Sequence, residues 1–338
     1  MKKSTINLLS FILIIIAGAV LRFTGLPQKP MHNDEAVNAV KFGNLLEKGE
    51  YAYDKIEYHG PVLYYITLIP TWVSSVQYFS QLNERHLRVV PAIAGIGLLL
   101  LLIILVEFAG WKVVLASSLI GAISPAMVFY SRYYIHETLL VFFTFGFIIS
   151  LFAFLVYRKN HWLIVSAIFL GLMHATKETF LISLVILFLS LYLDQKIWQG
   201  TNISVSQVIK SMHWYQYLVF LGIAGFISVL FFSSFFKNPQ GIIDSVSAYE
   251  NYFTKAGQNE IHQHPWYYYL KILAWNKGPE RLIWSELPVL VFSILGILFA
   301  FFNRGNTTRE QFFRIMALFS ILMLLLFSVM PYKTPWNI

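Results

Sequence analysis

The run RVVPAIAGIGLLLLLIILVEF, residues 88–108, decides the fold class of this chain. A helix that crosses a membrane needs about 20 mostly apolar residues, and this run supplies them with an ionisable residue only near each end. Similar apolar stretches recur along the chain, so we expect about nine membrane helices, at roughly 6–26, 88–108, 113–131, 138–157, 161–176, 179–193, 217–236, 287–303 and 315–331. The sequence therefore predicts an all-α, polytopic integral membrane protein.

The composition of the chain agrees with this class. Of the 338 residues, 57% are hydrophobic and 12% charged, and the mean hydropathy is +0.62, which is too apolar for a water-soluble domain. The absence of cysteine excludes disulfides, thiol catalysis and cysteine metal sites. The net charge of +8 comes from Lys and Arg scattered between apolar runs, without a basic stripe. We expect the membrane, and no nucleic acid, as a partner.

The positive-inside tendency decides how the stretch 61–80 is placed. If this stretch crossed the membrane, three basic clusters would lie outside: Arg158-Lys159, Lys196 with Lys210, and Arg304 with Arg309 and Arg314. If it lies flat in the outer interface, which its prolines and aromatic residues suit, all three lie inside. We therefore expect one membrane domain, residues 1–338, with surface helices on its outer face and outer loops at 27–87 and 237–286.

The N-terminus resembles a cleavable signal peptide in one respect. Lys2-Lys3, a short apolar run and Ala17-Gly18-Ala19 follow that pattern. The apolar run continues beyond the triplet, however, and we expect an uncleaved first helix.

The first polar group of the expected outer face is the segment Met31-His32-Asn33-Asp34-Glu35-Ala36. Asn33 is predicted to cap a short helix whose first turn contains Asp34 and Glu35. Two acids at a helix N-terminus can simply favour its dipole. In so acid-poor a chain, they also suit a general base, Asp34, with a neighbour that tunes or orients it, Glu35.

The second group is Glu57-Tyr58-His59-Gly60-Pro61. Its simpler interpretation is a turn marked by Gly-Pro. Its functional interpretation is that His59 or Glu57 projects towards Asp34 as a cation or a metal ligand. A lone His near a Glu is not a metal site, so a divalent metal stays an open possibility.

The third and fourth groups lie between apolar helices, at 130–137 and 174–178. Arg132 either extends to the lipid headgroups or holds a phosphate through its planar fork of donors, while Glu137 faces an acceptor or a cation. His136 lies between them in sequence. A structural ion pair or an interfacial lysine explains Lys177 and Glu178 as well as catalysis does.

The fifth group is the aromatic loop 260–269, EIHQHPWYYY. Its rings suit either a membrane-interface belt or a stacking wall for sugar rings. His262 and His264 are two residues apart and would need further ligands to bind a metal, so we interpret them as solvated loop histidines.

Acids, cations and aromatic rings at a lipid boundary suit a substrate with a phosphate headgroup and an apolar tail. The chemistry that fits is displacement at a sugar anomeric carbon. Asp34 would deprotonate or orient the acceptor, while Arg132 and Lys177 would stabilise the departing lipid phosphate. The chain contains no GxGxxG or GxxxxGK[ST] motif, which favours a lipid-linked donor over a nucleotide sugar.

Several segments in order carry a family resemblance: HNDEA, EYHGP, SRYYIHETLLVFF, ATKETF and the terminal PYKTPW. Together they resemble the GT-C superfamily of membrane glycosyltransferases, in its protein O-mannosyltransferase and aminoarabinose-transferase-like branch. With HPWYYYLKILAW, the chain is similar to a prokaryotic subgroup associated with lipid-linked glycan flipping and archaeal-type N-glycosylation. The resemblance covers essentially the whole chain.

The resemblance implies a polyprenyl-phosphate sugar donor, an inverting transfer and a catalytic acid in the first outer loop, which Asp34 matches. His59-Gly60-Pro61 matches the family's His-Pro-Pro or Lys-Pro-Pro element loosely, with Gly60 in place of a proline. Arg132 and Glu137 match its arginine and downstream acid. Family members commonly continue through further membrane helices, so we expect this chain to be short at its C-terminus.

The predicted function is a glycosyltransferase in the plasma membrane of a prokaryote, with its site facing outside and a protein, lipid or glycan as acceptor. Asp34 and Glu35 are the predicted catalytic residues and Arg132 and Lys177 the phosphate ligands; the auxiliary residues are His59, Glu57, His136, Glu137 and Glu178. Two alternatives remain, a lipid-linked glycan flippase or its accessory, and a non-catalytic scaffold. Transport would need polar residues deep inside several helices, whereas these lie mainly at helix ends.

Overall fold

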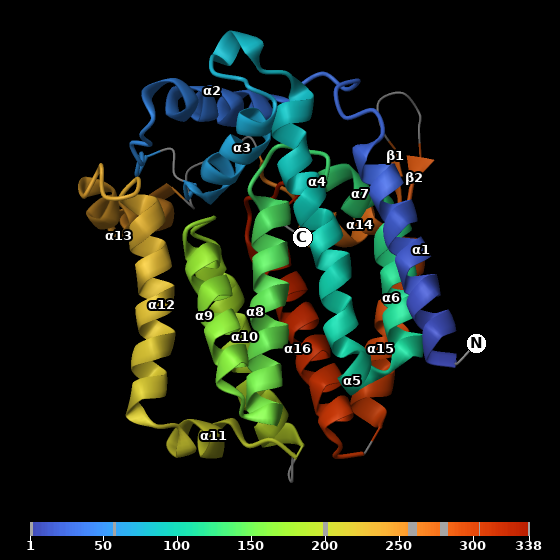
Figure 1. Cartoon of the computed structure of the whole chain (residues 1–338). Helices are drawn as coiled ribbons and strands as arrows, with labels where there is room; N and C mark the ends of the chain where they lie inside the picture. The colour runs from blue at the N-terminus through green and yellow to red at the C-terminus, as the bar shows by residue number, and fades with distance from the viewer. Residues whose placement is uncertain are drawn as a thin grey trace.

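The computed structural model describes residues 3–56, 59–198, 202–255, 262–277, 283–303 and 305–336. Long helices run side by side, and α2 and α3 lie across one end of the bundle (Figure 1). The elements are α1 (Lys3–Phe23), α2 (Asn33–Lys48), α3 (Val62–Val73), η1 (Phe79–Gln81), α4 (Glu84–Leu101), η2 (Leu102–Leu105), α5 (Val106–Ala109), α6 (Trp111–Ile123), α7 (Pro125–Tyr130), α8 (Glu137–Tyr157), α9 (Asn160–His174), α10 (Phe180–Ile197), α11 (Val205–Ser211), α12 (Trp214–Phe232), α13 (Gln240–Lys255), α14 (Tyr268–Ala274), β1 (Asn276–Lys277), β2 (Ile283–Trp284), α15 (Leu287–Phe302) and α16 (Thr308–Val329).

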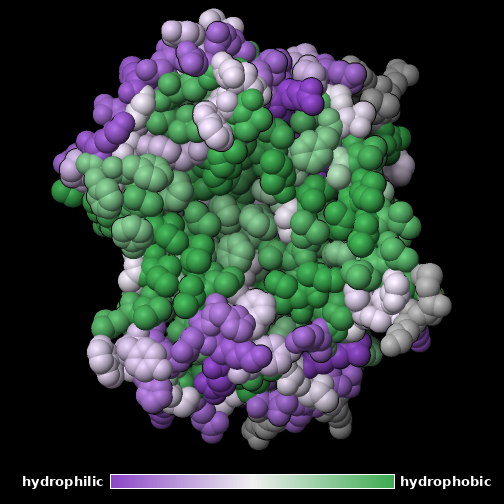
Figure 2. Space-filling model, viewed as in Figure 1, coloured by the Kyte–Doolittle hydropathy of each residue, from purple (hydrophilic) through white to green (hydrophobic). Residues whose placement is uncertain are grey.

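The apolar surface of the bundle fits a membrane. Within the described residues, 6 helices are long and apolar enough to cross one: α1, the stretch Glu84–Ala109, α8, α10, α12 and α16. Apolar side chains form a band between two polar ends (Figure 2). The prediction of an all-helical integral membrane protein is therefore confirmed. Each predicted apolar stretch contains a helix, but that all of them cross the membrane stays a prediction.

The prediction of one helix over 113–131 is wrong, because this stretch forms two helices, α6 and α7, separated at Ser124. Pro125 has no N–H to continue the hydrogen-bond ladder of α6. It instead takes the first position of α7, where the Ser124 hydroxyl accepts the Met127 N–H at 3.2 Å. The buried Glu286 carboxylate also accepts the Ala126 N–H at 2.6 Å, which fixes this new helix start.

The stretch 61–80 does not form a full-length helix. It contains the 12-residue α3, which is too short to be counted among the long helices, followed by turns and η1. Together with α2, α3 lies across the bundle end instead of alongside α8 (Figure 1). That this end faces outside stays a prediction.

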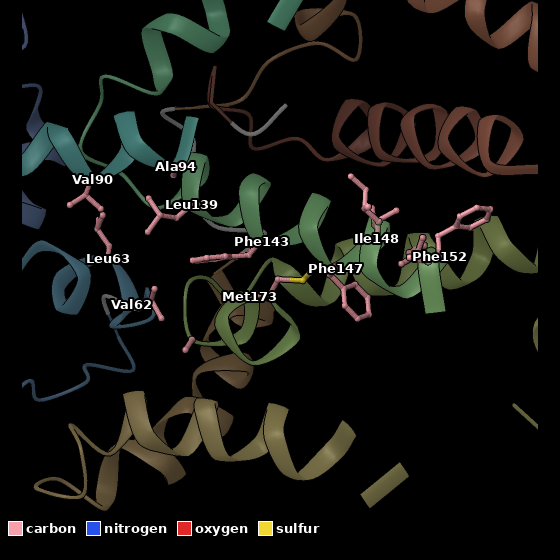
Figure 3. Packing of buried hydrophobic residues seen from close by; sticks show 14 of the residues in the cluster. Val62, Leu63, Val90, Ala94, Leu139, Phe143, Phe147, Ile148, Phe152 and Met173 are labelled. Carbon is pink, nitrogen blue, oxygen red and sulfur yellow. The ribbon is translucent and has the colours of Figure 1, made fainter. Parts of the chain in front are cut away.

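The core of the bundle is built around α8. Its Phe143 and Phe147 are buried, and they lie among side chains from α3, α4 and α9 (Figure 3). Val62 and Leu63 bring the start of α3 into this same core. The polar loop that precedes α8 is therefore fastened to a rigid, close-packed element.

The end of α10 and the start of α16 lie at the opposite end of the bundle, where α11 also lies (Figure 1). A buried ion pair joins these two helices. Arg314 Nε donates to Asp194 Oδ1 at 2.7 Å, and both side chains are fully buried. Gln311 donates to the other carboxylate oxygen at 3.0 Å and to the Ile203 carbonyl at 2.9 Å. These hydrogen bonds offset the free-energy cost of removing the Asp194 carboxylate from water.

Candidate active site

Contacts between distant segments gather the predicted polar groups at the α2 end of the bundle. The HNDEA segment begins α2, residues 131–136 connect α7 to α8, and 175–179 connect α9 to α10. Glu35 accepts the backbone N–H of Tyr134, Glu137 pairs with Lys177, and Glu178 pairs with His59. Groups that lie far apart in the sequence therefore meet in space.

Glu35 is fully buried and engaged with three elements. Arg88 donates to both of its oxygens, Nε at 2.7 Å and Nη2 at 2.8 Å, and the N–H groups of Tyr134 and His32 donate at 2.9 and 3.1 Å. Burial alone would raise the pKa of Glu35, but these bonds lower it below its ordinary value. Glu35 is therefore an ionised anchor that fixes the start of α2.

Arg88 pairs with Glu35, and the sequence pattern did not predict this role. It begins the apolar run 88–108, and its guanidinium also donates to the carbonyls of Leu26 and Lys29, each at 2.7 Å. One buried side chain thus links α4, the loop after α1 and the start of α2. The available signal was its position, since an arginine at the edge of a membrane helix usually has a partner.

Asp34 differs from Glu35 in both its burial and its hydrogen bonding. Its side chain is partly exposed, and none of the residues within the described ranges hydrogen-bonds or ion-pairs with its carboxylate. The prediction that Asn33 caps this helix is wrong, because Asn33 is already its first residue. His32 is the cap instead, and its Nδ1 accepts the Asp34 N–H at 3.3 Å.

Arg132 is fastened to the end of α1. Its Nη2 donates to the carbonyls of Thr24 at 2.7 Å and Gly25 at 3.1 Å. In the part of the chain that the structure describes, no carboxylate forms an ion pair with it. Its orientation is thereby fixed while its charge is left unneutralised.

Lys177 and Glu137 form a close ion pair between the α9–α10 turn and the first residue of α8. Both side chains are largely buried, with 10% and 13% of their surface exposed. Glu137 therefore faces a cation, one of its two predicted alternatives.

His59 lies beside Glu178, with Nδ1 3.3 Å from Oε2, and Tyr53 donates its hydroxyl to the other oxygen at 3.0 Å. Burial alone would raise the pKa of Glu178, but the hydrogen bond and charge of His59 lower it. Gly60 is required next to this pair, because a Cβ there would lie 2.1 Å from the Ala175 carbonyl oxygen. Its N–H donates to the Thr176 carbonyl at 3.0 Å, which the proline of the family pattern could not do.

His136 is fully buried between these groups. Its Nε2–H donates to the Gly60 carbonyl at 3.2 Å, and its ring lies 4.9 Å from that of His59. Burial and then the charges of His59 and Lys177 hold the pKa of His136 well below its ordinary value. The ring is therefore neutral, and its Nδ1 lone pair has no partner among the residues described.

The terminal PYKTPW segment folds back onto this end of the bundle. Tyr332 forms an antiparallel bridge with Gln263, and Lys333 donates its N–H to the His262 carbonyl at 2.9 Å. Trp336 then reaches His32 and Tyr133, with ring centroids 6.0 and 6.1 Å apart. The last segment therefore lies beside the start of α2.

The sequence offered His59 and Glu57 as metal ligands. No group of three or more His, Asp or Glu side chains with metal-binding geometry occurs in the described ranges. Glu57, a predicted auxiliary residue, lies outside them. His262 and His264 contact Tyr332 and Tyr268 through their rings.

A protein-family model for dolichyl-phosphate-mannose-protein mannosyltransferases matches residues 64–237, just over half of the chain. The chain belongs to this mannosyltransferase family. The matched range includes Arg88, Arg132 and Lys177 and begins after Asp34 and His59. No curated protein sequence matches the chain.

Solved membrane glycosyltransferases share the fold of this mannosyltransferase-family chain. ArnT from Cupriavidus metallidurans bound to undecaprenyl phosphate is similar with a TM-score of 0.67 and 12% identity, over 96% of this chain and 56% of that one. The Archaeoglobus fulgidus oligosaccharyltransferase AglB, in complex with an inhibitory peptide and a dolichol-phosphate, gives 0.62 and 13%, over 99% and 48%. The S. cerevisiae protein O-mannosyltransferase Pmt1-Pmt2 complex bound to the sugar donor gives 0.55 and 19%, over 69% and 34%.

The family match confirms the prediction of a GT-C chain of the protein O-mannosyltransferase type, and the solved structures confirm its fold. The chain spans between 34% and 56% of the length of these three structures. The narrower prokaryotic subgroup stays a prediction.

Proposed function

We propose that this chain is a glycosyltransferase that moves a sugar from a polyprenyl-phosphate-linked donor to an acceptor on the outer face of a prokaryotic plasma membrane. Its family is that of mannosyltransferases that use a lipid-phosphate sugar. The similar ArnT and AglB structures contain undecaprenyl phosphate and a dolichol-phosphate, and the Pmt1-Pmt2 complex contains its sugar donor. An acceptor of protein, lipid or glycan fits this proposal.

The observation that carries the proposal is the difference between two adjacent carboxylates. Glu35 is buried and held by four hydrogen bonds. Asp34, one residue earlier, is partly exposed on the helix start that those bonds fix. A general base needs a carboxylate that is accessible and held in position. Asp34 is accessible, and Glu35 fixes the helix start that carries it.

In the proposed step, Asp34 takes the proton from an acceptor hydroxyl while that oxygen forms a bond to the anomeric carbon. The bond between this carbon and the phosphate oxygen breaks, and its electron pair leaves with the lipid phosphate. Attack from the face opposite the leaving phosphate inverts the anomeric centre. Glu35 acts on this step only through the position of α2.

The departing phosphate needs positive charge at a fixed position. Arg132 supplies a guanidinium oriented by the end of α1, and Lys177 an ammonium oriented by Glu137. His59, positioned by Glu178, is a third group for this side of the substrate. We assign the phosphate to these three residues.

The experiment is transfer of radiolabelled sugar from a panel of polyprenyl-phosphate donors in proteoliposomes, with wild type compared with Asp34→Asn. Transfer by wild type alone supports the enzyme and its base, and the active donor identifies the sugar. Donor binding by both proteins with transfer by neither would contradict the proposal in favour of a flippase or its accessory.

A further inference from the structure

Three aromatic rings from distant parts of the chain lie together beside Asp34. The ring of His32 is 5.5 Å from Tyr133 and 6.0 Å from Trp336, and Tyr133 and Trp336 are 6.1 Å apart. We call these residues the aromatic triad. His32 is itself tied to the base, because its ring accepts the Asp34 N–H.

The three rings are not equally accessible. Tyr133 is buried, with 4% of its surface exposed, and its ring also stacks against that of Phe129. His32 is exposed and Trp336 partly so. Tyr133 therefore forms the floor of the aromatic triad, and Trp336 presents the large ring that a ligand could contact.

The position of the aromatic triad indicates which part of the substrate would contact it. His32 and Asp34 mark the side of the proposed base. Tyr133 lies in the loop between Arg132 and Glu137, which marks the side of the proposed phosphate ligands. In a displacement between base and phosphate, the sugar ring occupies the interval between them.

We propose that Trp336 is the residue that recognises the donor's sugar, by stacking its indole ring against the C–H face of the pyranose. This inference rests on the proposed function and adds a specificity determinant to it. His32 and Tyr133 hold the indole, and the bridge between Tyr332 and Gln263 holds the segment that carries it. Aromatic stacking of this kind changes affinity by about three- to tenfold.

The neighbouring loop offers a rival stacking residue. Trp266 is 66% exposed, and its ring contacts Tyr267. It belongs to the aromatic run for which the sequence left a sugar wall as one alternative. Trp266→Ala is therefore the matched comparison for Trp336→Ala.

The test measures binding of polyprenyl-phosphate mannose, glucose and galactose against polyprenyl phosphate alone, in Asp34→Asn protein so that turnover does not consume the ligand. We expect one sugar-bearing lipid to bind about three- to tenfold more tightly than the bare lipid. Trp336→Ala removes this preference but retains binding of the bare lipid, which also shows that the variant is folded. Trp336→Phe and Trp266→Ala keep it.

Preference retained by Trp336→Ala, or lost in Trp266→Ala, overturns the inference. Equal binding of bare and sugar-bearing lipids by the Asp34→Asn parent overturns it as well, while the phosphate site stands. If no lipid phosphate binds the parent, the proposed function fails, and this inference falls with it.

Discussion

Among the described residues, a buried arginine–carboxylate pair occurs at each end of the bundle, and the two pairs have the same contact distance. Arg88 Nε of α4 lies 2.7 Å from Glu35 in the first turn of α2, and Arg314 Nε of α16 lies 2.7 Å from Asp194 of α10. Neither pair exposes more than 1% of a side chain. Buried charge by itself therefore does not distinguish a functional end from a structural one.

The surroundings of the two pairs make the difference. Gln311 donates a further hydrogen bond to Asp194, and the Arg314 guanidinium lies 5.3 Å from the centroid of the Trp198 ring. Glu35 is also fully hydrogen-bonded, but the partly exposed Asp34 directly precedes it in the first turn of α2. One pair joins two helices, and the other positions a second, available acid.

The largest expected effect comes from removing that available acid. Asp34→Asn keeps the size of the side chain and removes its basicity, so transfer should fall by about 10²- to 10⁴-fold with donor binding nearly unchanged. Glu50→Gln, an exposed acid just after α2, is the control and should transfer at the wild-type rate. Wild-type turnover by Asp34→Asn would remove Asp34 from its role.

The second prediction breaks the two buried pairs in the same way. Arg88→Met and Arg314→Met each leave a buried carboxylate without its cation, and each should destabilise the protein by about 3–5 kcal/mol in thermal unfolding. In the double variant Arg314→Met with Asp194→Leu, stability should return and transfer should persist.

The corresponding double variant at the start of α2, Arg88→Met with Glu35→Leu, should lose transfer even if its stability returns to that of wild type. It leaves the Tyr134 and His32 N–H groups without their acceptor and frees the start of α2. Equal transfer by the two double variants would contradict the distinction between the ends.

A third prediction concerns the phosphate side. Arg132→Ala should weaken binding of polyprenyl phosphate by about 10- to 100-fold, the usual range for charged hydrogen bonds. Arg309→Ala, at the opposite end, serves as the matched loss of charge and should bind normally. Unchanged affinity in Arg132→Ala would leave the phosphate to Lys177 and His59.

The smallest expected effect is a dependence of stability on pH. The folded pKa of Glu35 is lowered, so its contribution is fully present above its unfolded value, about 4.5, and is lost as pH falls through the folded value. The melting temperature of wild type should therefore approach that of Glu35→Gln in acid. A difference between them that stays constant on acidification would show that Glu35 is not ionised in the fold.

The sequence predicted the helices better than the links between them. Apolar runs are local, so most helix positions could be predicted within a few residues, although α16 begins at Thr308, seven residues before the predicted start at 315. The charged loops could be grouped by the positive-inside tendency. Ser124-Pro125 is a helix-break signal, but it lies within an apolar stretch that predicts a single membrane helix.

The partner of Glu35 could not be read in the same way. Arg88 lies 53 residues away, and nothing in the local pattern selects it over Arg85 or Arg132. The approach of Trp336 to His32 depends likewise on the bridge at Tyr332, which forms only when the bundle has brought both segments to one end.

The most direct test of the account is to map where a photoreactive polyprenyl-phosphate sugar crosslinks to the protein in bilayers. We predict labelled peptides from the start of α2, the loop before α8 and the turn at Lys177. Label concentrated instead around Asp194 and Arg314 would contradict the assignment of the α2 end as the site.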